Sequence, residues 1–298
     1  MTPVFVGLDC GGSTSRALAV DMTGAPIFHG QSGAANLATT REPMLRRHLA
    51  RATEGCPSAS AVCGCFAGLM TENDRQRAKA LLGELFPGAS VRAEPDYAAA
   101  FASAEQGIDV CVIAGTGSLV CSSNNGGWVK SGGGGYLLGD YGSAFDFGRH
   151  VLQHYVFDGE TPTPFTVKLI EQTFETKEIN EVISRLYASP APPAVLAKLA
   201  TALTKDADAG ETYALEAIDK AMQSLARLTV RHIHRHVKST GTVRIGLAGG
   251  VWKTSASVLN VFTSSIRDQL DRSFEVERLN RPPVYGATAL AKELTLGN

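Results

Sequence analysis

The sequence predicts an α/β protein built from two duplicated domains. Two stretches indicate this, because each reads as a strand, a glycine-rich turn and a returning strand: residues 4–20 (VFVGLDCGGSTSRALAV) and residues 109–130 (DVCVIAGTGSLVCSSNNGGWVK). A third glycine turn, residues 246–250 (GLAGG), ends one strand and precedes a helix. Two hairpins of the same layout, about a hundred residues apart, suggest a duplication.

The hairpin tips suit the binding of phosphate. The first tip consists of Gly11, Gly12, Ser13 and Thr14, and the second of Gly115, Thr116, Gly117 and Ser118. Glycines let backbone N–H groups converge on an anion, while the hydroxyls add donors. Asp9, where the first strand breaks, can hold a hydrated Mg²⁺. One such loop could be an ordinary turn, but three at strand ends predict a nucleotide site.

The chain resembles the actin, heat-shock chaperone and sugar-kinase superfamily, and within it the branch of N-acetylglucosamine kinases and BadF/BadG/BcrA/BcrD-type ATPases. The resemblance covers essentially the whole chain, through GLDCGGSTSRA from Gly7, IAGTGS from Ile113, LLGDYGSA from Leu137 and GLAGGVWK from Gly246. One departure is Cys10, which stands where glycine is common in the family and raises the question of backbone strain.

This resemblance implies two ribonuclease-H-like (actin-like ATPase) domains with a nucleotide and sugar cleft between them. The expected N-terminal domain covers residues 1–114, with the C-terminal helix 284–298 packing back on it, and the expected C-terminal domain covers residues 115–283. At 298 residues, 44% of them hydrophobic, the chain is long enough for two cores.

The elements of the first half follow from local patterns. Apolar runs bounded by turn residues predict strands at 26–31, 59–66 and 90–93 after the first hairpin. Helical periodicity predicts helices at 42–52, 73–85 and 97–104, the second beginning at a capping-type Thr71 or Asn73. A three-stranded antiparallel meander followed by helices is typical of a ribonuclease-H-like domain.

In the second half, an Asn-Gly turn at Asn125 and Gly126 follows the second hairpin. Residues 157–204 are helical and carry little chemical signal. The remaining expected elements are helices at 143–156, 209–238, 255–270 and 284–294, and strands at 243–248 and 274–279. Pro282 and Pro283 break the chain before the last helix.

Charge and composition exclude several classes of partner. Lysine and arginine total 28 against 29 acidic residues, for a net charge of −1, which favours neither nucleic acid nor an anionic membrane. No apolar run is long enough to span a bilayer, and the N-terminus lacks a basic leader. We therefore expect a soluble cytoplasmic protein.

The six cysteines mostly lie in strand-like apolar runs, which is typical of buried thiols in a reducing compartment. Cys63 and Cys65 could form half of a metal site, but no second pair has zinc-like spacing. The sequence also lacks the paired cysteines with which dehydratase-activating relatives hold an iron–sulfur cluster. It likewise lacks the zinc-binding cysteine motif of ROK kinases.

Asn36 and Asp96 are the candidate substrate residues of the first half. Asn36 offers a donor and an acceptor, as two sugar hydroxyls require, although a turn asparagine is the alternative. Asp96 follows Pro95 at a predicted helix start, where an acid often serves as a cap. Similar kinases place a sugar-binding Asn in this loop and use the acid of a D-x-x-x-A helix start as the base. The resemblance therefore implies that Asp96 is catalytic.

The glycine-rich stretch SGGGGYLLGDYG, residues 131–142, is expected to form a loop that approaches a ligand. Similar N-acetylglucosamine kinases carry G-W-G at the positions of Gly133, Gly134 and Gly135, and a sugar-contacting acid at that of Asp140. The alternative role for Asp140 is a negative charge at a helix N-terminus. The missing Trp and Tyr141, which replaces a frequent acid, put the identity of the sugar in doubt.

The remaining candidates concern the nucleotide and metals. The resemblance implies that Ala209 lies against the adenine. The bare glycines Gly249 and Gly250 permit adenosine to lie on the backbone, and Lys253 is near enough in sequence to reach the adenosine. His232 and His236 share a helix face and could bind metal, but a basic last turn that complements the helix dipole is favoured.

Together these features predict ATP-dependent phosphorylation of an amino sugar at its 6-hydroxyl, most simply N-acetylglucosamine, with Mg²⁺ held by Asp9. Glucosamine or N-acetylmuramic acid is an alternative acceptor. The rivals from other classes are a BadF-type regulatory ATPase that acts on a protein partner and a nucleotide-binding scaffold without turnover. Walker and Rossmann motifs are absent. The oligomeric state stays open, a homodimer included.

Overall fold

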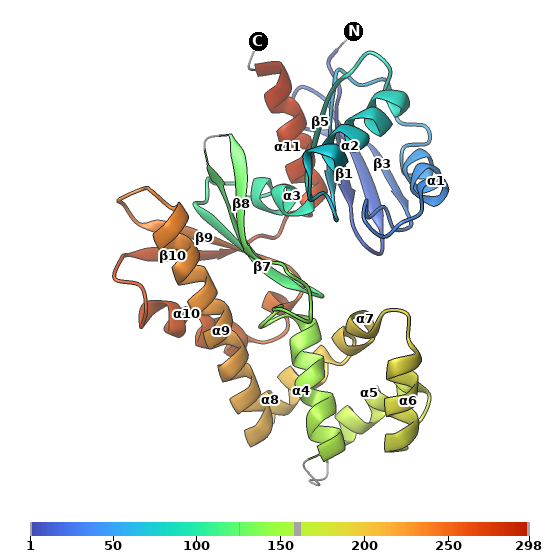
Figure 1. Cartoon of the computed structure of the whole chain (residues 1–298). Helices are drawn as coiled ribbons and strands as arrows, with labels where there is room; N and C mark the ends of the chain where they lie inside the picture. The colour runs from blue at the N-terminus through green and yellow to red at the C-terminus, as the bar shows by residue number, and fades with distance from the viewer. Residues whose placement is uncertain (1, 125, 158–161, 297–298) are drawn as a thin grey trace. The chain divides into compact units, whose positions relative to one another are not determined.

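The computed structural model describes residues 2–124, 126–157 and 162–296. It divides into two compact units (Figure 1). The first unit comprises residues 1–107 and 279–298, and the second comprises residues 108–278. Asn125 of the expected Asn-Gly turn, and residues 297 and 298 of the expected C-terminal helix, lie outside the described ranges.

The first unit is one five-stranded sheet flanked by helices, with strand order β3-β2-β1-β4-β5. Strand β1 is antiparallel to β2 and parallel to β4. Its elements are β1 (Phe5–Cys10), β2 (Ser15–Val20), β3 (Pro26–Ser32), α1 (Glu42–Ala52), β4 (Ala61–Phe66), α2 (Glu72–Leu85), β5 (Ser90–Pro95), α3 (Asp96–Ala102) and α11 (Pro283–Leu296).

Alternation along β1 decides which helices cover which face. Val6, Leu8 and Cys10 point into a core shared with Leu45 of α1 and Leu82 of α2. Helices α3 and α11 pack against each other and against β1 and β4. Helix α11 thus returns from the end of the chain to complete the first unit.

The second unit repeats this sheet with strand order β10-β9-β6-β7-β8. Read from β8 to β10, this order matches that of the first unit strand for strand, with β6 in the place of β1. Its strands are β6 (Val110–Ala114), β7 (Ser118–Asn124), β8 (Gly127–Gly132), β9 (Val243–Ala248) and β10 (Phe274–Arg278). The predicted duplication is therefore confirmed at the level of topology, because both units share a hairpin followed by two parallel strands.

The helices of the second unit fall into two groups (Figure 1). Helices α4 (Ala144–Phe157), α5 (Pro164–Phe174), α6 (Ile179–Ala188), α7 (Pro192–Ala197) and α8 (Ala200–Asp208) are grouped together after β8. Helix α9 (Thr212–His236) and helix α10 (Ala256–Arg267) pack side by side, with the 3₁₀ turn η1 (Val251–Lys253) between β9 and α10. Trp252 of η1 donates from Nε1 to the carbonyl of Val112 at 3.2 Å, which ties this turn to the sheet.

Two expectations about the chain are corrected, and the question raised by Cys10 is answered. The predicted boundary after residue 114 is wrong, because β6 hydrogen-bonds to β7 and β9 and so belongs to the second unit. Helix α9 begins at Thr212 rather than at Ala209, since Gly210 adopts a positive φ of 91° that ends α8. Cys10 causes no backbone strain, because Asp140 and Glu175 are the two described non-glycine residues with positive φ.

All six cysteines are free, and five of them are buried. Over the described ranges no group of three His, Cys, Asp or Glu side chains is arranged to hold a metal ion. In the same ranges no helix is both long and apolar enough to cross a membrane.

His232 is a buried structural residue rather than a metal ligand. Its Nε2 lies 3.0 Å from Ser122 Oγ of β7, and its Nδ1 lies 2.9 Å from Ser131 Oγ of β8. The residue is fully buried, and its pKa is lowered to about 4, first because burial disfavours the imidazolium and second because His236 lies beside it. His232 therefore fastens α9 to two strands as a neutral ring.

We expect this histidine to make the protein less stable in acid. In the unfolded chain His232 binds a proton near pH 6.5, whereas in the folded chain it binds one only near pH 4. The contribution of the neutral ring to the free energy of unfolding is therefore fully present above pH 6.5 and is lost as the pH falls from 6.5 to 4. At about 1.4 kcal/mol per pH unit this amounts to about 3 kcal/mol.

Urea unfolding of the wild type and of His232→Gln at about pH 7.5 and about pH 4.5 measures this loss. The wild type should lose about 3 kcal/mol more than the variant between the two conditions, because all other titrating groups are shared. An equal loss in both proteins would show that His232 is not held neutral by the fold.

Candidate functional site

The first hairpin tip is a four-residue connection between β1 and β2. Cys10 pairs with Ser15 at the end of the ladder, and the N–H of Gly11 donates to the carbonyl of Thr14 at 2.9 Å. Gly12 and Ser13 between them are exposed. The closed base and open tip are what a loop needs to present its backbone and hydroxyls to an anion.

Asp9 and Asp96 come together at the carboxyl ends of the parallel strands of the first-unit sheet. Asp9 lies level with Cys65 of β4, which lies level with Glu94 of β5, and Asp96 follows two residues later at the start of α3. The pKa of Asp9 is raised to about 6, first by burial and second by the charge of Asp96, while Arg16 opposes the shift. The two carboxylates are therefore close enough to repel each other.

This pair of acids fits a hydrated divalent cation. Mg²⁺ prefers oxygen ligands, keeps several waters and is usually held by one or two protein carboxylates together with substrate phosphates. The side chain of Asp9 is 17% exposed, with Arg16 Nη1 3.9 Å from its Oδ2, so the carboxylate is accessible yet largely desolvated. A cation here would offset both the burial and the repulsion that raise its pKa.

Asp96 occupies the first turn of α3, as the sequence predicts. Pro95 precedes the helix in extended backbone and provides no side-chain cap. Asp96 is half-buried, and its Oδ1 accepts a hydrogen bond from the N–H of Tyr97 at 2.9 Å. This bond fixes the direction of the carboxylate, so helix-terminal stabilisation and a role as proton acceptor are compatible in one residue.

Asn36 is a turn residue, and this corrects part of the expectation. Its Oδ1 accepts hydrogen bonds from the N–H groups of Ala38 at 2.8 Å and Thr39 at 3.1 Å, so the acceptor offered to a sugar is engaged by the backbone. The amide Nδ2 stays the side chain's donor. The N–H of Ala35 donates to the carbonyl of Gly11 at 3.0 Å, which brings this loop beside the hairpin tip.

The second hairpin tip has a shorter loop and a helix behind it. The N–H of Gly115 donates to the carbonyl of Gly117 at 2.9 Å. The first turn of α4 donates back to the tip, from Ala144 to the carbonyl of Gly115 at 2.8 Å and from Phe145 to that of Thr116 at 3.2 Å. The tip is thereby held against the start of α4.

The third glycine turn lies against this second tip. Gly249 has a φ of 109°, and a Cβ there would overlap the carbonyl of Ala114 and lie 3.0 Å from the nitrogen of Gly115. A residue without a side chain is therefore needed for the two turns to touch. Gly250 follows at the start of η1, and Lys253 is exposed at its end.

Ala209 belongs to the same region of the second unit. It is exposed at the end of α8, next to Asp208, whose Oδ1 accepts a hydrogen bond from Ser255 Oγ at 2.8 Å. Ser255 precedes α10 two residues after Lys253. The second unit thus brings together the second tip, the turn at 249–250, Lys253 and Ala209.

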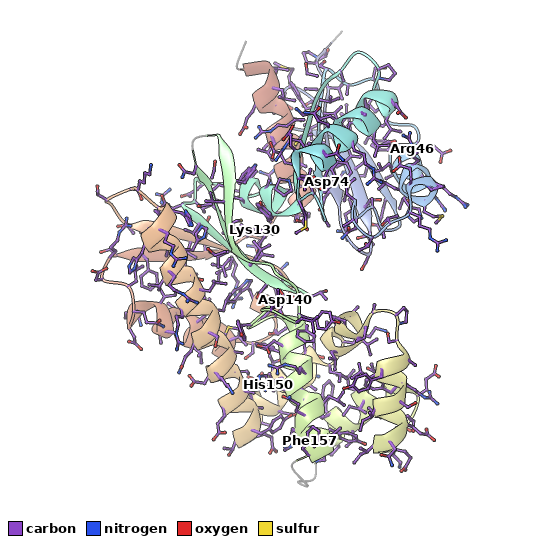
Figure 2. All side chains as sticks on the ribbon, viewed as in Figure 1. Arg46, Asp74, Lys130, Asp140, His150 and Phe157 are labelled. Atoms are coloured by element: carbon purple, nitrogen blue, oxygen red, sulfur yellow. The ribbon has the colours of Figure 1, made fainter. Side chains whose placement is uncertain are left out.

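Asp140 lies against the second hairpin tip, at the opposite end of α4 from Phe157 (Figure 2). Its Oδ1 accepts a hydrogen bond from the N–H of Ser118 at 3.0 Å, and a Cβ on Gly117 would come within 2.9 Å of its carboxylate. The pKa of Asp140 is raised, first by burial, while the Ser118 N–H opposes the shift and Asp146 adds to it.

The alternative role of Asp140 was a negative charge at the start of α4, and Asp146 has this role instead. Asp146 is not among the residues predicted from the sequence. Buried Asp146, in the first turn of α4, accepts the N–H of Gly142 at 2.9 Å and pairs with Arg149 at 2.7 Å. The signal was present, because an acid in a first helical turn is a familiar pattern. Gly133, Gly134 and Gly135 precede Asp140, and the N–H of Gly133 donates to the carbonyl of Ser118 at 3.2 Å.

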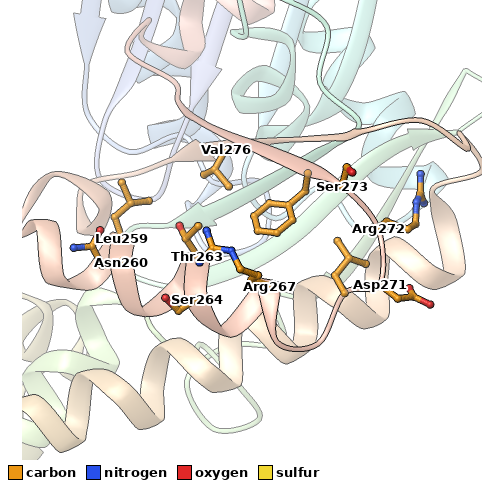
Figure 3. Close-up of a pocket in the computed structure, with 11 residues that line it drawn as sticks. Leu259, Asn260, Thr263, Ser264, Arg267, Asp271, Arg272, Ser273 and Val276 are labelled. Carbon is orange, nitrogen blue, oxygen red and sulfur yellow. The ribbon is translucent and has the colours of Figure 1, made fainter.

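Two cavities of the second unit differ in whether the predicted residues line them. One of about 840 Å³ lies between α10 and β10, and none of the predicted residues lines it (Figure 3). Another of about 410 Å³ is lined by Ser118 and Asp140 together with residues of α9. The predicted chemistry is thus associated with the smaller cavity.

The repeated sheet, with a glycine hairpin at the centre of each copy, defines the class of two-domain actin-like ATPases that includes the sugar kinases. A candidate N-acetylglucosamine kinase from Chromobacterium violaceum has this fold, with a TM-score of 0.69 at 19% identity over 97% of this chain and 99% of that one. A ROK family glucokinase from Streptomyces griseus, in complex with glucose and AMPPNP, gives 0.61 at 17% identity over the same shares.

The model of the BadF/BadG/BcrA/BcrD ATPase family matches residues 6–288, and the chain belongs to this family. An N-acetyl-D-glucosamine kinase of Dictyostelium discoideum is 29% identical over 210 residues, which cover 62% of this chain. The match spans 64% of the length of that relative. Family and fold expectations from the sequence are thereby confirmed.

Proposed function

We propose that this protein transfers the γ-phosphate of ATP to the 6-hydroxyl of an amino sugar, with N-acetylglucosamine as the favoured acceptor. The observation that supports this best is the gathering of the first hairpin tip, Asp9, Asn36 and Asp96 at one end of the first unit. Family membership supports the use of ATP, and the Dictyostelium relative supports the acceptor.

In the first unit, Asp96 would accept the proton of the attacking 6-hydroxyl. Phosphoryl transfer depends chiefly on positioning and charge neutralisation, so one oriented base and one phosphate loop meet much of the requirement. Gly12, Ser13 and Thr14 would face the γ-phosphate, and the amide of Asn36 would donate to a sugar oxygen. Bound Mg²⁺, held by Asp9, would supply charge neutralisation at the phosphates.

In the second unit, the second tip would contact the nucleotide phosphates through Thr116, Gly117 and Ser118. The bare backbone at Gly249 and Gly250 would carry the adenosine, with Ala209 and Lys253 at its sides. Asp140, next to the loop of Gly133, Gly134 and Gly135, would accept hydrogen bonds from ring hydroxyls. Free cysteines are consistent with a cytoplasmic location.

The second candidate function is a regulatory ATPase that acts on a protein partner, since the family includes ATPases by name. The two carboxylates beside the first tip favour the kinase, because a proton acceptor is needed when the acceptor is a hydroxyl.

A panel of hexoses and hexosamines, assayed with ATP and Mg²⁺ for ADP release above the rate without sugar, tests the proposal. We expect N-acetylglucosamine to stimulate release most among the neutral sugars, and the product to carry phosphate at O6. If no sugar stimulates ADP release, the regulatory ATPase becomes the better account.

A further inference from the structure

The cavity of about 410 Å³ in the second unit has two chemically different walls. Ser118 and Asp140 line it from the side of the hairpin tip and the glycine-rich loop. Ser224, Arg227 and Arg231 line it from helix α9. Its volume falls within the range of small-molecule sites, about 300–1,000 Å³.

The two arginines of this cavity are available for a ligand. They are four residues apart on α9, so their side chains project from one face of the helix, and both are exposed. Within the described ranges neither forms a hydrogen bond or an ion pair, in contrast to Arg149, which pairs with Asp146 at 2.7 Å. Two guanidinium groups without a partner at one cavity are suited to a carboxylate or a phosphate.

Asp140 makes the wall that it lines unsuitable for a bare anion. Its carboxylate accepts the N–H of Ser118, and within the described ranges it is not paired with either arginine. A free anion would be repelled by Asp140, while an ammonium group would be repelled by Arg227 and Arg231. A ligand that presents a hydroxyl at one end and an anionic group at the other satisfies both walls.

We propose that this cavity binds a sugar that carries an anionic group, with the carboxylate or phosphate at Arg227 and Arg231 and a hydroxyl donating to Asp140. The inference rests on the proposed function for the assignment of Asp140 to sugar hydroxyls, and it deepens that function by naming the class of sugar. The anion has two sources: an acidic substituent of the acceptor sugar, or the phosphate of the sugar phosphate that the reaction forms.

Isothermal titration of the full chain without nucleotide, at constant ionic strength, tests this inference. The probes are N-acetylmuramic acid, N-acetylglucosamine 6-phosphate, N-acetylglucosamine and inorganic phosphate. We expect at least one anionic sugar to bind about tenfold or more tightly than both N-acetylglucosamine and inorganic phosphate, because hydrogen bonds between guanidinium groups and an anion are stronger than those between neutral groups. Tightest binding of N-acetylmuramic acid assigns the anion to the acceptor, and tightest binding of the sugar phosphate assigns it to the product.

The double variant Arg227→Gln/Arg231→Gln should lose this preference, with about a tenfold or larger rise in Kd for the anionic sugar. Arg235→Gln is the matched control, because Arg235 is exposed on the same helix but does not line the cavity. It should keep the wild-type Kd, and circular dichroism should show all three proteins folded.

Three results would overturn the inference: no preference for anionic sugars, inorganic phosphate binding as tightly as they do, or a preference that survives in the double variant. The proposed kinase activity is judged separately by ADP release. A protein that prefers anionic sugars through its arginines but transfers phosphate to no sugar would contradict the proposed function alone.

Discussion

Replacing Asp96 by Asn is expected to lower the sugar-dependent rate of ADP formation by about a hundredfold or more, because general-base catalysis typically contributes factors of about 10²–10⁴. The amide cannot accept the proton of the attacking hydroxyl. Its oxygen can still accept the N–H of Tyr97, as Oδ1 does now at 2.9 Å, so the start of α3 should persist. The effect should therefore appear in kcat, with the affinity for ATP close to that of the wild type.

A second readout follows from the coupling of the two acids. The charge of Asp96 is the second-largest cause of the raised pKa of Asp9, after burial. In Asp96→Asn the pKa of Asp9 should fall from about 6, though not to its ordinary value, because burial remains. A carboxyl titration by nuclear magnetic resonance measures this shift independently of turnover.

Glu54→Gln provides the matched control for Asp96→Asn. Glu54 is an exposed acid of the first unit outside the predicted site, and its neutralisation should leave both turnover and the pKa of Asp9 unchanged. A folded Asp96→Asn protein with wild-type turnover would remove Asp96 from the role of base.

Replacing Gly286 by Ala is expected to lower the free energy of unfolding by about 2–3 kcal/mol, at the upper end of what overpacking costs. Gly286 lies in α11, where it is buried against α3. A Cβ there would overlap the carbonyl of Ala99 and lie 2.6 Å from the nitrogen of Ser103. Because both are backbone atoms, no side chain can rotate away, and the two helices must move apart.

Gly83→Ala is the opposite case in the same unit. Gly83 lies inside α2, and a Cβ there would have no atom within 4 Å. Alanine is the better helix former, so this variant should be more stable by about 0.5–1 kcal/mol. Denaturant unfolding of both variants compares one chemical change in two surroundings. If Gly286→Ala were as stable as Gly83→Ala, the close packing of α11 on α3 would be wrong.

Many elements could be predicted from the sequence because their signals are local. Helix α1 spans Glu42–Ala52 and β9 spans Val243–Ala248, the bounds expected from periodicity and flanking turn residues. Helix α2 begins after Thr71, whose side chain forms a capping box with Asp74. The twofold repetition of a hairpin was likewise visible in residue order, and the shared strand order follows from it.

The site residues were predictable in kind but not in their surroundings. Asp96 stands at a helix start, as Pro95 predicts, yet its influence on Asp9 depends on the register of β1, β4 and β5. The polar and turn-prone character of Asn36 is predictable from its residue type, but the engagement of its side-chain oxygen by the N–H groups of Ala38 and Thr39 depends on how the loop closes.

By itself, the sequence determined the family, the repeated α/β topology and the residue types that could handle phosphate, since these are written in short motifs and in periodicity. Tertiary structure alone decided that β6 belongs to the second unit, that His232 is buried between two serines, and that Asp140 accepts an N–H from Ser118, 22 residues away. The physical reason is that burial and hydrogen bonds between distant segments depend on which backbones meet, and no local pattern carries that information.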